Sequence, residues 1–310
     1  MRSSTEDGAC GAPWVVVRCG VQLLLTVSVL VVSPVALDVP HVQRLYSEPV
    51  YSDDTPPGKV REMLYRALVN FLLLPWPAYS VQQQQSNQQH QHSQQDRQRM
   101  LQAFLSTLTQ PITSVDVAQL QADPALREKS SSSIKECLCL IRSQLCQLSG
   151  ADRSSRELYW ICIREPLNKT IHQLMSLYCH SPTLLLEMVG VVMWSVGVVG
   201  GGCGSSSNSV TEVSGWIERA VQLVTQRPYL EAAVANDQSS QAAVLAKLLH
   251  LLSLVLSDPS PAFKKLVGAV VATLDEIYPM VSQQPTAAIR QPLFAVLRTL
   301  LEHNWKYFYR

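Results

Sequence analysis

The fold class is decided by residues 59–74, KVREMLYRALVNFLLL. Polar side chains such as Arg61, Glu62 and Asn70 fall on one side of a helix drawn through this segment. The preceding residues 52–57, SDDTPP, offer Asp and Thr as helix caps and a proline suited to a first helical turn. Apolar residues recur at intervals of three and four and predict an amphipathic helix: Val60, Met63, Leu64, Ala67, Leu68, Phe71 and Leu72.

The same spacing continues along the chain and predicts an all-α protein. No segment shows the period-two alternation of a strand, and helix pairs recur at about 40 residues. We therefore expect a HEAT- or armadillo-like α-α superhelical solenoid, with a helical bundle as the alternative. Residues 112–133 and about 200–209 are expected to be loops. Further helices are predicted at residues 100–108, 134–148, 155–164, 166–179, 183–199, 213–226, 241–257, 263–277 and 293–301.

A glutamine-rich tract interrupts this pattern at about residues 80–98. Such a composition cannot bury enough apolar surface to offset the entropy lost on ordering. We expect a disordered loop inserted between two helices. Metal binding by His90 and His92 within the tract is the functional alternative.

The N-terminal 40 residues differ from the rest. Residues 15–37, VVVRCGVQLLLTVSVLVVSPVAL, carry Arg18 as their only charge. Three interpretations are open: a secretory signal, a membrane anchor, or a buried helix in a start sequence outside the fold. We favour the third, and assign the solenoid to residues 41–310. The triplet Asn168-Lys169-Thr170 would accept a sugar only in a secreted protein.

Charge and composition point to protein partners. The 310 residues carry a formal net charge of +1, and their Lys and Arg are not clustered. Nucleic-acid binding needs a basic patch or stripe, so it is not expected, and neither is a membrane partner. Apolar residues make up 47% of the chain, which is enough for a sizeable core.

Cysteines and tryptophans are expected mainly in the helical core. The long chain and the apolar surroundings of its cysteines favour reduced, buried thiols over disulfides or zinc sites. Trp194 and Trp305 are expected to be packing residues. The eight cysteines are Cys10, Cys19, Cys137, Cys139, Cys146, Cys162, Cys179 and Cys203.

No catalytic constellation is recognisable. The chain lacks the P-loop, Rossmann, zinc-protease and serine-hydrolase motifs. His172 and His180 lie near Cys179, but a metal site needs three or four converging ligands. Asp275 and Glu276 are adjacent, so on a helix they point about 100° apart and do not form an acid–base pair. We expect no catalytic, cofactor-binding or metal-binding residues and no enzymatic activity.

Two segments resemble the exportins, the nuclear export receptors of the importin-β superfamily. The first, residues 45–77, is LYSEPVYSDDTPPGKVREMLYRALVNFLLLPWP. The second, residues 262–310, ends in LFAVLRTLLEHNWKYFYR. Between them, at about residues 130–256, the order of helices agrees while identities are looser. The first 40 residues do not look like the family.

The resemblance implies a karyopherin built from HEAT repeats that shuttles between nucleus and cytoplasm. Such a receptor binds protein cargo together with Ran-GTP in the nucleus and releases it in the cytoplasm. The member that residues 45–77 resemble implies actin, usually bound to profilin, as cargo. The Ran-binding repeats of the family would lie outside this chain, and nucleoporins remain open as partners. The alternative function is a secreted or membrane-anchored helical-repeat protein led by the apolar N-terminus.

Overall fold

The computed structural model describes residues 20–24, 26, 44, 46, 58–73, 94–200, 207–283 and 287–306. Within these residues the regular elements are helices and no strand occurs, which confirms the all-α prediction. The chain divides into two compact units, Met1–Leu108 and Thr109–Arg310. Most of the apolar N-terminal segment and most of the glutamine-rich tract lie outside the described residues.

The first unit contains α3 (Lys59–Leu73) and the start of α4 (Gln94–Thr113). The rings of Tyr65 and Phe104 stack with centroids 5.9 Å apart. Arg97 donates hydrogen bonds of 3.1 and 2.8 Å to the carbonyl of Leu72. These bonds satisfy a carbonyl at the end of α3 that has no partner within the helix. The helix predicted at residues 59–74 is confirmed.

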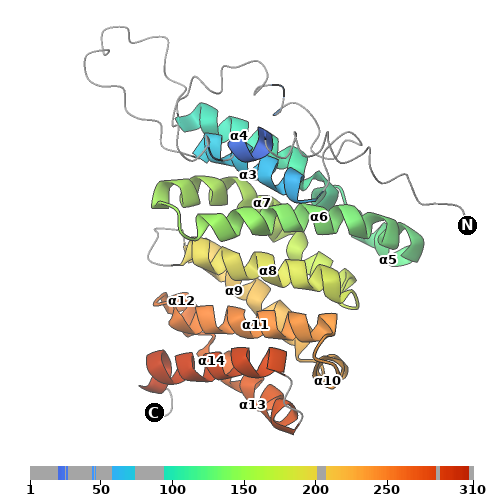
Figure 1. Cartoon of the computed structure of the whole chain (residues 1–310), viewed down its shortest axis with the longest axis vertical. Coiled ribbons are helices and arrows are strands. Elements are labelled where there is room, and N and C mark those ends of the chain that lie inside the picture. Colours follow the sequence, from blue (N-terminus) through green and yellow to red (C-terminus); the bar gives the residue numbers. More distant parts are fainter. Residues whose placement is uncertain are drawn as a thin grey trace, which may run out of the picture. The chain divides into compact units, whose positions relative to one another are not determined.

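The second unit is a stack of helices in two layers (Figure 1). One layer consists of α6, α8, α11 and α14, each packed on the next. The other consists of α7, α9, α10, α12 and α13, and α5 packs at its start on α6 and α7. The bounds are α5 (Val117–Ala122), α6 (Pro124–Leu148), α7 (Arg153–Leu177), α8 (Pro182–Val199), α9 (Ser207–Val224), α10 (Arg227–Ala235), α11 (Ser240–Ser257), α12 (Pro261–Lys264), α13 (Val267–Gln283) and α14 (Ala287–Asn304).

Neighbouring helices of one layer run parallel with a recurring offset. Polar contacts between them join residues 43 to 48 positions apart in sequence. This offset is the length of one structural repeat, and it falls at the HEAT value of about 40–47 residues. The contacts are Arg142–Glu187, Arg164–Ser209, Ser176–Arg219, Ser253–Thr299 and Leu256–Asn304.

The step from α8 to α11 is longer than the others. Gly200 at the end of α8 lies against Asp258 at the end of α11, and a side chain at 200 would overlap the Asp258 carboxylate. These two equivalent positions are 58 residues apart. The extra length is taken up by α10, which lies between α9 and α11 in sequence and packs on both. The repeat is therefore irregular here, and the predicted spacing of about 40 residues fails at this step.

The core runs along α8 and α11, the two central helices of their layer. Both are long and apolar enough to cross a membrane by length and composition. However, 67% of the α8 window and 50% of the α11 window are buried inside the fold. A helix that is buried between neighbours on three sides needs apolar residues nearly all round. Their composition is explained by packing.

Two predicted helix ends are wrong because the helices continue through a proline. α4 continues through Pro111 to Thr113, and α7 continues through Pro166 to Leu177. Proline removes one backbone hydrogen bond and disfavours the helix interior. In α7 this cost is offset by burial of the flanking turns, where Ile163 and Leu167 have no exposed surface.

The loop predicted at residues 112–133 is also wrong. Asp116 caps α5 by accepting hydrogen bonds from Ala118 N and Gln119 N at 3.0 and 3.3 Å. Asp123 caps α6 in the same way, and Pro124 occupies its first turn. The serine run at residues 130–133 therefore lies inside α6 rather than in a turn.

Smaller corrections concern three connections. Pro228 opens α10, which was not predicted, and the helix predicted at 263–277 is divided into α12 and α13. α4 begins at Gln94, so residues 94–98 at the end of the predicted Gln-rich loop are helical. α9 begins at Ser207, inside the predicted Gly/Ser loop, whose residues 201–206 lie outside the described part.

Candidate functional site

The candidate site is the outer side of the layer formed by α6, α8 and α11. α8 contacts α6 and α11 at its sides and α7 and α9 behind, so only a narrow stripe of α8 remains open. The stripes of α6 and α11 beside it are open on the same side. We call these three stripes the α6–α8–α11 face. They contain Lys135, Cys139, Arg142 and Cys146 of α6; Thr183, Glu187 and Trp194 of α8; and Ala243, Lys247, His250 and Leu254 of α11.

An ion pair joins α6 to α8 in the middle of this face. Arg142 Nε lies 2.5 Å from Glu187 Oε2, and the two side chains are 26% and 14% exposed. Burial lowers the pKa of Arg142, but the hydrogen bond and charge of Glu187 outweigh it and raise that pKa overall. The pair is therefore ionised and partly shielded from water.

Gly190 makes room for Arg142 on α8. A Cβ atom at this position would lie 2.5 Å from Arg142 Cδ, far inside van der Waals contact. The arginine stem therefore lies across the α8 backbone at a place where only glycine leaves the space. This explains a glycine in the middle of a buried helix, where it costs about 0.5–1 kcal/mol relative to alanine.

Lys247 extends the charged centre to α11. The register set by Gly200 and Asp258 places Lys247 within one helical turn of Glu187 on the neighbouring helix. The side chain is half-buried, and burial and the charge of Arg142 lower the pKa of Lys247, against an opposing effect of Glu187. In the part of the chain that the structure describes, no carboxylate lies within ion-pair distance of its ammonium group.

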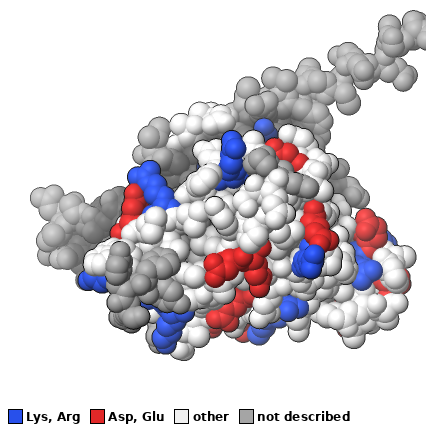
Figure 2. Space-filling model, turned by 90° about the horizontal axis from the view of Figure 1, so that it is seen from below, with Lys and Arg blue, Asp and Glu red and all other residues white. Residues whose placement is uncertain are grey.

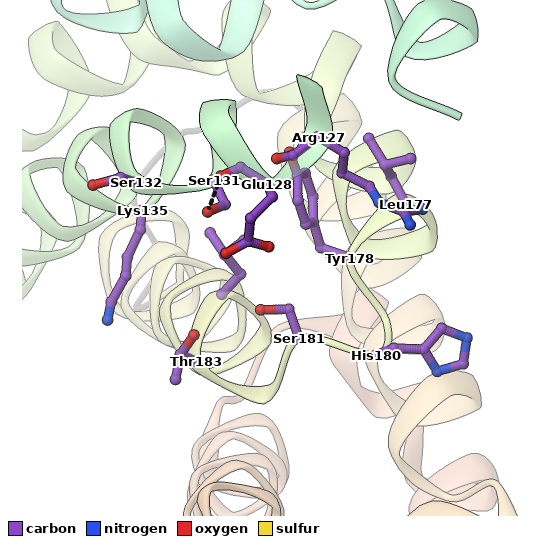
Figure 3. A pocket seen from close by; sticks show the side chains of 11 residues that line it. Arg127, Glu128, Ser131, Ser132, Lys135, Leu177, Tyr178, His180, Ser181 and Thr183 are labelled. Carbon is purple, nitrogen blue, oxygen red and sulfur yellow. Dashed lines mark hydrogen bonds between the residues drawn. The ribbon is translucent and has the colours of Figure 1, made fainter. Parts of the chain in front are cut away.

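A pocket of about 440 Å³ opens where α6 passes the turn between α7 and α8. Lys135 and Thr183 line it, so it adjoins the α6–α8–α11 face. Figure 3 shows the Glu128 side chain pointing toward Ser181 across the pocket, while His180 points away. The wall is held by Tyr178, whose hydroxyl donates a 3.0 Å hydrogen bond to the carbonyl of Arg127. Hydroxyls and charges of both signs suit polar contacts with a protein surface.

Charges of both signs also alternate elsewhere. Seen from the end that carries α13 and α14, Lys and Arg are interspersed with Asp and Glu among wide uncharged areas (Figure 2). α14 exposes Phe294 (58%) and Leu301 (62%), and Trp305, directly after its end, is 49% exposed. This distribution agrees with the formal net charge of +1.

The residues weighed as metal ligands or catalytic groups do not converge. His172 lies on α7 against Gly215 of α9, where burial and the charge of Arg219 lower the pKa of His172. His180 is exposed in the turn before α8. Within the described residues no group of three His, Cys, Asp or Glu side chains could hold a metal ion. His90 and His92 lie outside these residues.

The expected burial of cysteines and tryptophans is only partly confirmed. Cys137 and Cys162 are buried and form no disulfide, and burial raises the pKa of Cys162 to about 11. Cys146 is exposed, because it lies on the open stripe of α6. Trp194 is half-buried and Trp305 is 49% exposed, so neither is enclosed in the core. Cys139 and Cys179 are half-buried and form no disulfide, and Cys10, Cys19 and Cys203 lie outside the described residues.

The tryptophans that do pack in the core were not singled out from the sequence. Trp160 of α7 and Trp216 of α9 lie with ring centroids 6.1 Å apart, and they are 4% and 0% exposed. They join neighbouring helices of the second layer. A signal was present, since both stand in line with the apolar stripes of their helices.

Curated proteins with similar sequences are exportins. Exportin-6-A of Xenopus laevis is 25% identical over 294 residues, which cover 93% of this chain and 24% of that protein. Exportin-6 of Danio rerio is 25% identical over 316 residues, covering 99% of this chain and 26% of that protein. The chain is exportin-6-like along nearly its whole length. Human exportin-6 is 23% identical over 291 residues, covering 93% of this chain and 25% of that protein.

The exportin-6-like chain spans about a quarter of the length of these relatives. No protein-family model matches it, and no solved structure does. The resemblance seen in residues 45–77 and 262–310 is thus confirmed over a wider range. The helical array is the kind of fold that the resemblance implied, and nuclear export receptors are the family to which the similarity points.

The positions of the charged residues in the sequence of α8 and α11 indicate which side of each helix is open. Glu187 is the only charged residue of α8, and Lys247 is the only one of α11 if histidine is counted as neutral. A single charge in an otherwise apolar helix marks the side that stays in contact with water or a partner. No single helix, however, reveals that these two charges meet.

Proposed function

We propose that this chain is part of a nuclear export receptor that carries protein cargo out of the nucleus together with Ran-GTP. Similarity to exportin-6 over 93–99% of the chain supports this, and so does the two-layer stack of parallel helices. By resemblance the cargo is actin with profilin. The receptor would shuttle between nucleus and cytoplasm, and nucleoporins would be transient partners.

The role is binding rather than catalysis. A stack of repeats presents a long surface built from one helix of each repeat, which suits the recognition of a folded protein. The α6–α8–α11 face is such a surface, since it combines an ion pair, an unpaired cation, hydroxyls and a tryptophan. We assign cargo contact to this face, and we place the Ran-GTP contact in repeats of the longer receptor outside this chain. The proposal needs no metal, cofactor, nucleic acid or membrane.

Retention of cargo tests the proposal. A full-length receptor that contains this chain is immobilised and incubated with purified actin–profilin and with Ran loaded with either GTP or GDP. We expect actin–profilin to be retained with Ran-GTP and washed away with Ran-GDP. Equal retention with both forms of Ran contradicts the transport mechanism. A receptor from which the residues corresponding to 109–310 are deleted serves as the control for cargo contact.

A further inference from the structure

The centre of the α6–α8–α11 face contains more positive than negative charge. Arg142 and Lys247 share a single carboxylate, that of Glu187, and Glu187 is committed to the 2.5 Å ion pair with Arg142. Lys247 thus has up to three N–H donors free of any carboxylate among the described residues. A half-buried cation without a counter-charge is costly, so the site favours an anionic group from outside.

The surroundings restrict what that anion belongs to. In the α8–α11 register Trp194 stands within one turn of Leu254, so aromatic and aliphatic surface flanks the cations. Leu254 is 38% exposed on this face. A nucleic-acid backbone would need a row of cations at phosphate spacing, whereas the described residues of this face include three, Lys135, Arg142 and Lys247, and Arg142 is already paired with Glu187. A protein segment with one carboxylate beside an apolar side chain fits both features.

We propose that the centre of this face binds an acidic segment of a partner protein, with one Asp or Glu carboxylate held between Lys247 and Arg142. The ammonium group of Lys247 donates to this carboxylate, and Arg142 adds a second charge while it remains paired with Glu187. Because both side chains are partly buried, the interaction is screened by salt less than a fully exposed pair would be. The inference rests on the proposed function in that it takes the face to be one that contacts proteins.

A short acidic probe measures this site without Ran or cargo. The probe is a fluorescein-labelled peptide of ten glutamates, and binding to the full chain is followed by fluorescence anisotropy at low salt. We expect Lys247→Met to weaken binding about fivefold or more, and Lys247→Arg to retain it. Glu187→Gln is expected to tighten binding, because it removes the competing carboxylate. Circular dichroism and thermal unfolding verify that each variant is folded.

Matched controls separate a specific site from general attraction. Lys264→Met removes an exposed lysine from α12, outside the face, and Glu218→Gln removes an exposed carboxylate from α9. Both are expected to leave binding within twofold of the unchanged chain. The proposal is overturned if Lys264→Met weakens binding as much as Lys247→Met, if the peptide does not bind, or if single-stranded DNA of ten nucleotides competes equally well.

The two proposals fail in different ways. Suppose that Lys247→Met loses peptide binding and that the receptor shows no Ran-GTP-dependent retention of actin–profilin. The acidic-segment site is then supported, and the transport function is contradicted. Suppose instead that Lys247→Met leaves Ran-GTP-dependent retention intact and that peptide binding does not depend on Lys247. The transport function is then supported, and the proposed site is contradicted.

Discussion

Ser253 of α11 and Thr299 of α14 share a hydrogen bond of 2.9 Å although 46 residues separate them. Thr299 already donates its hydroxyl to the carbonyl of Ala295 at 2.8 Å, so Ser253 is the donor between the helices. The bond fixes the parallel register of two successive repeats. We expect Ser253→Ala and Thr299→Val each to lower the free energy of unfolding by about 0.5–1.5 kcal/mol.

A double-mutant cycle in urea tests whether the two losses share one cause. The double variant should be destabilised by clearly less than the sum of the single variants, because both remove the same bond. Ser257→Ala is the control, since its hydroxyl bonds only the carbonyl of Leu254 in its own helix. Additive losses would contradict a direct bond between α11 and α14.

The ion pair of Arg164 and Glu212 joins α7 to α9 in the other layer. Arg164 Nε lies 3.0 Å from Glu212 Oε2, and the two side chains are 36% and 19% exposed. Arg164→Met should cost about 1–3 kcal/mol, because it leaves a largely buried carboxylate without its cation. Glu212→Gln should cost less, since the arginine it leaves can reach water.

The control for this pair is Lys169→Met, which breaks an ion pair with Glu165 within one helix. Those side chains are 69% and 71% exposed, so the loss should be small and clearly less than that in Arg164→Met. Urea unfolding followed by tryptophan fluorescence reports on this region, because Trp160 and Trp216 are buried between the same two helices. Equal losses in Arg164→Met and Lys169→Met would show that burial does not set the strength of the pair.

Asp237 caps a helix that begins 50 residues later. Its carboxylate accepts hydrogen bonds from Ala287 N and Ala288 N, at 3.1 and 3.0 Å, and so closes the first turn of α14. Asp237→Ala should lower the free energy of unfolding by about 1 kcal/mol, and Asp237→Asn by less because asparagine also caps. Chemical denaturation measures both. Asp275→Ala, on the exposed side of α13, is the control and should change stability by at most about 0.5 kcal/mol.

Helices were predictable from this sequence wherever apolar residues recur at helical spacing between turn-forming residues. The stripes at residues 134–148, 183–199 and 241–257 each lie within one helix of the structure. Helix ends were predicted less well, because Asp116 and Asp123 form caps through backbone geometry that a list of polar residues does not reveal. Prolines within helices were misjudged since only tertiary packing stabilises them.

The candidate site was not predictable, because it depends on register. Arg142 and Glu187 are 45 residues apart, and Lys247 follows 60 residues after Glu187. The first separation in sequence equals one repeat, whereas the second includes the inserted α10. A constant repeat length therefore does not predict that the three charged residues lie together. The family resemblance gave the kind of fold and the likeness to exportins, but it brought no residue assignment with it.

The carboxylate of Asp152 at the start of α7 gives a pH-dependent prediction. Burial raises the pKa of Asp152, but this is outweighed by hydrogen bonds from the Ser155 hydroxyl at 2.6 Å and the Ser155 N–H at 3.0 Å, and the pKa falls below its ordinary value. A carboxylate with a lowered pKa stabilises the fold at pH values above its unfolded pKa, about 3.9, and loses this contribution as pH falls through the folded pKa.

Ser155→Ala should therefore destabilise the chain most at neutral pH. The difference in free energy of unfolding from the unchanged chain should stay constant above about pH 5 and shrink as pH falls below about 4, because a protonated Asp152 no longer gains from the hydroxyl. Urea titrations at pH 6, 4 and 3 measure this. Ser154→Ala, at the exposed neighbour, should give a difference that does not vary with pH. A constant difference for Ser155→Ala as well would show that the hydroxyl supports the helix without stabilising the charge of Asp152.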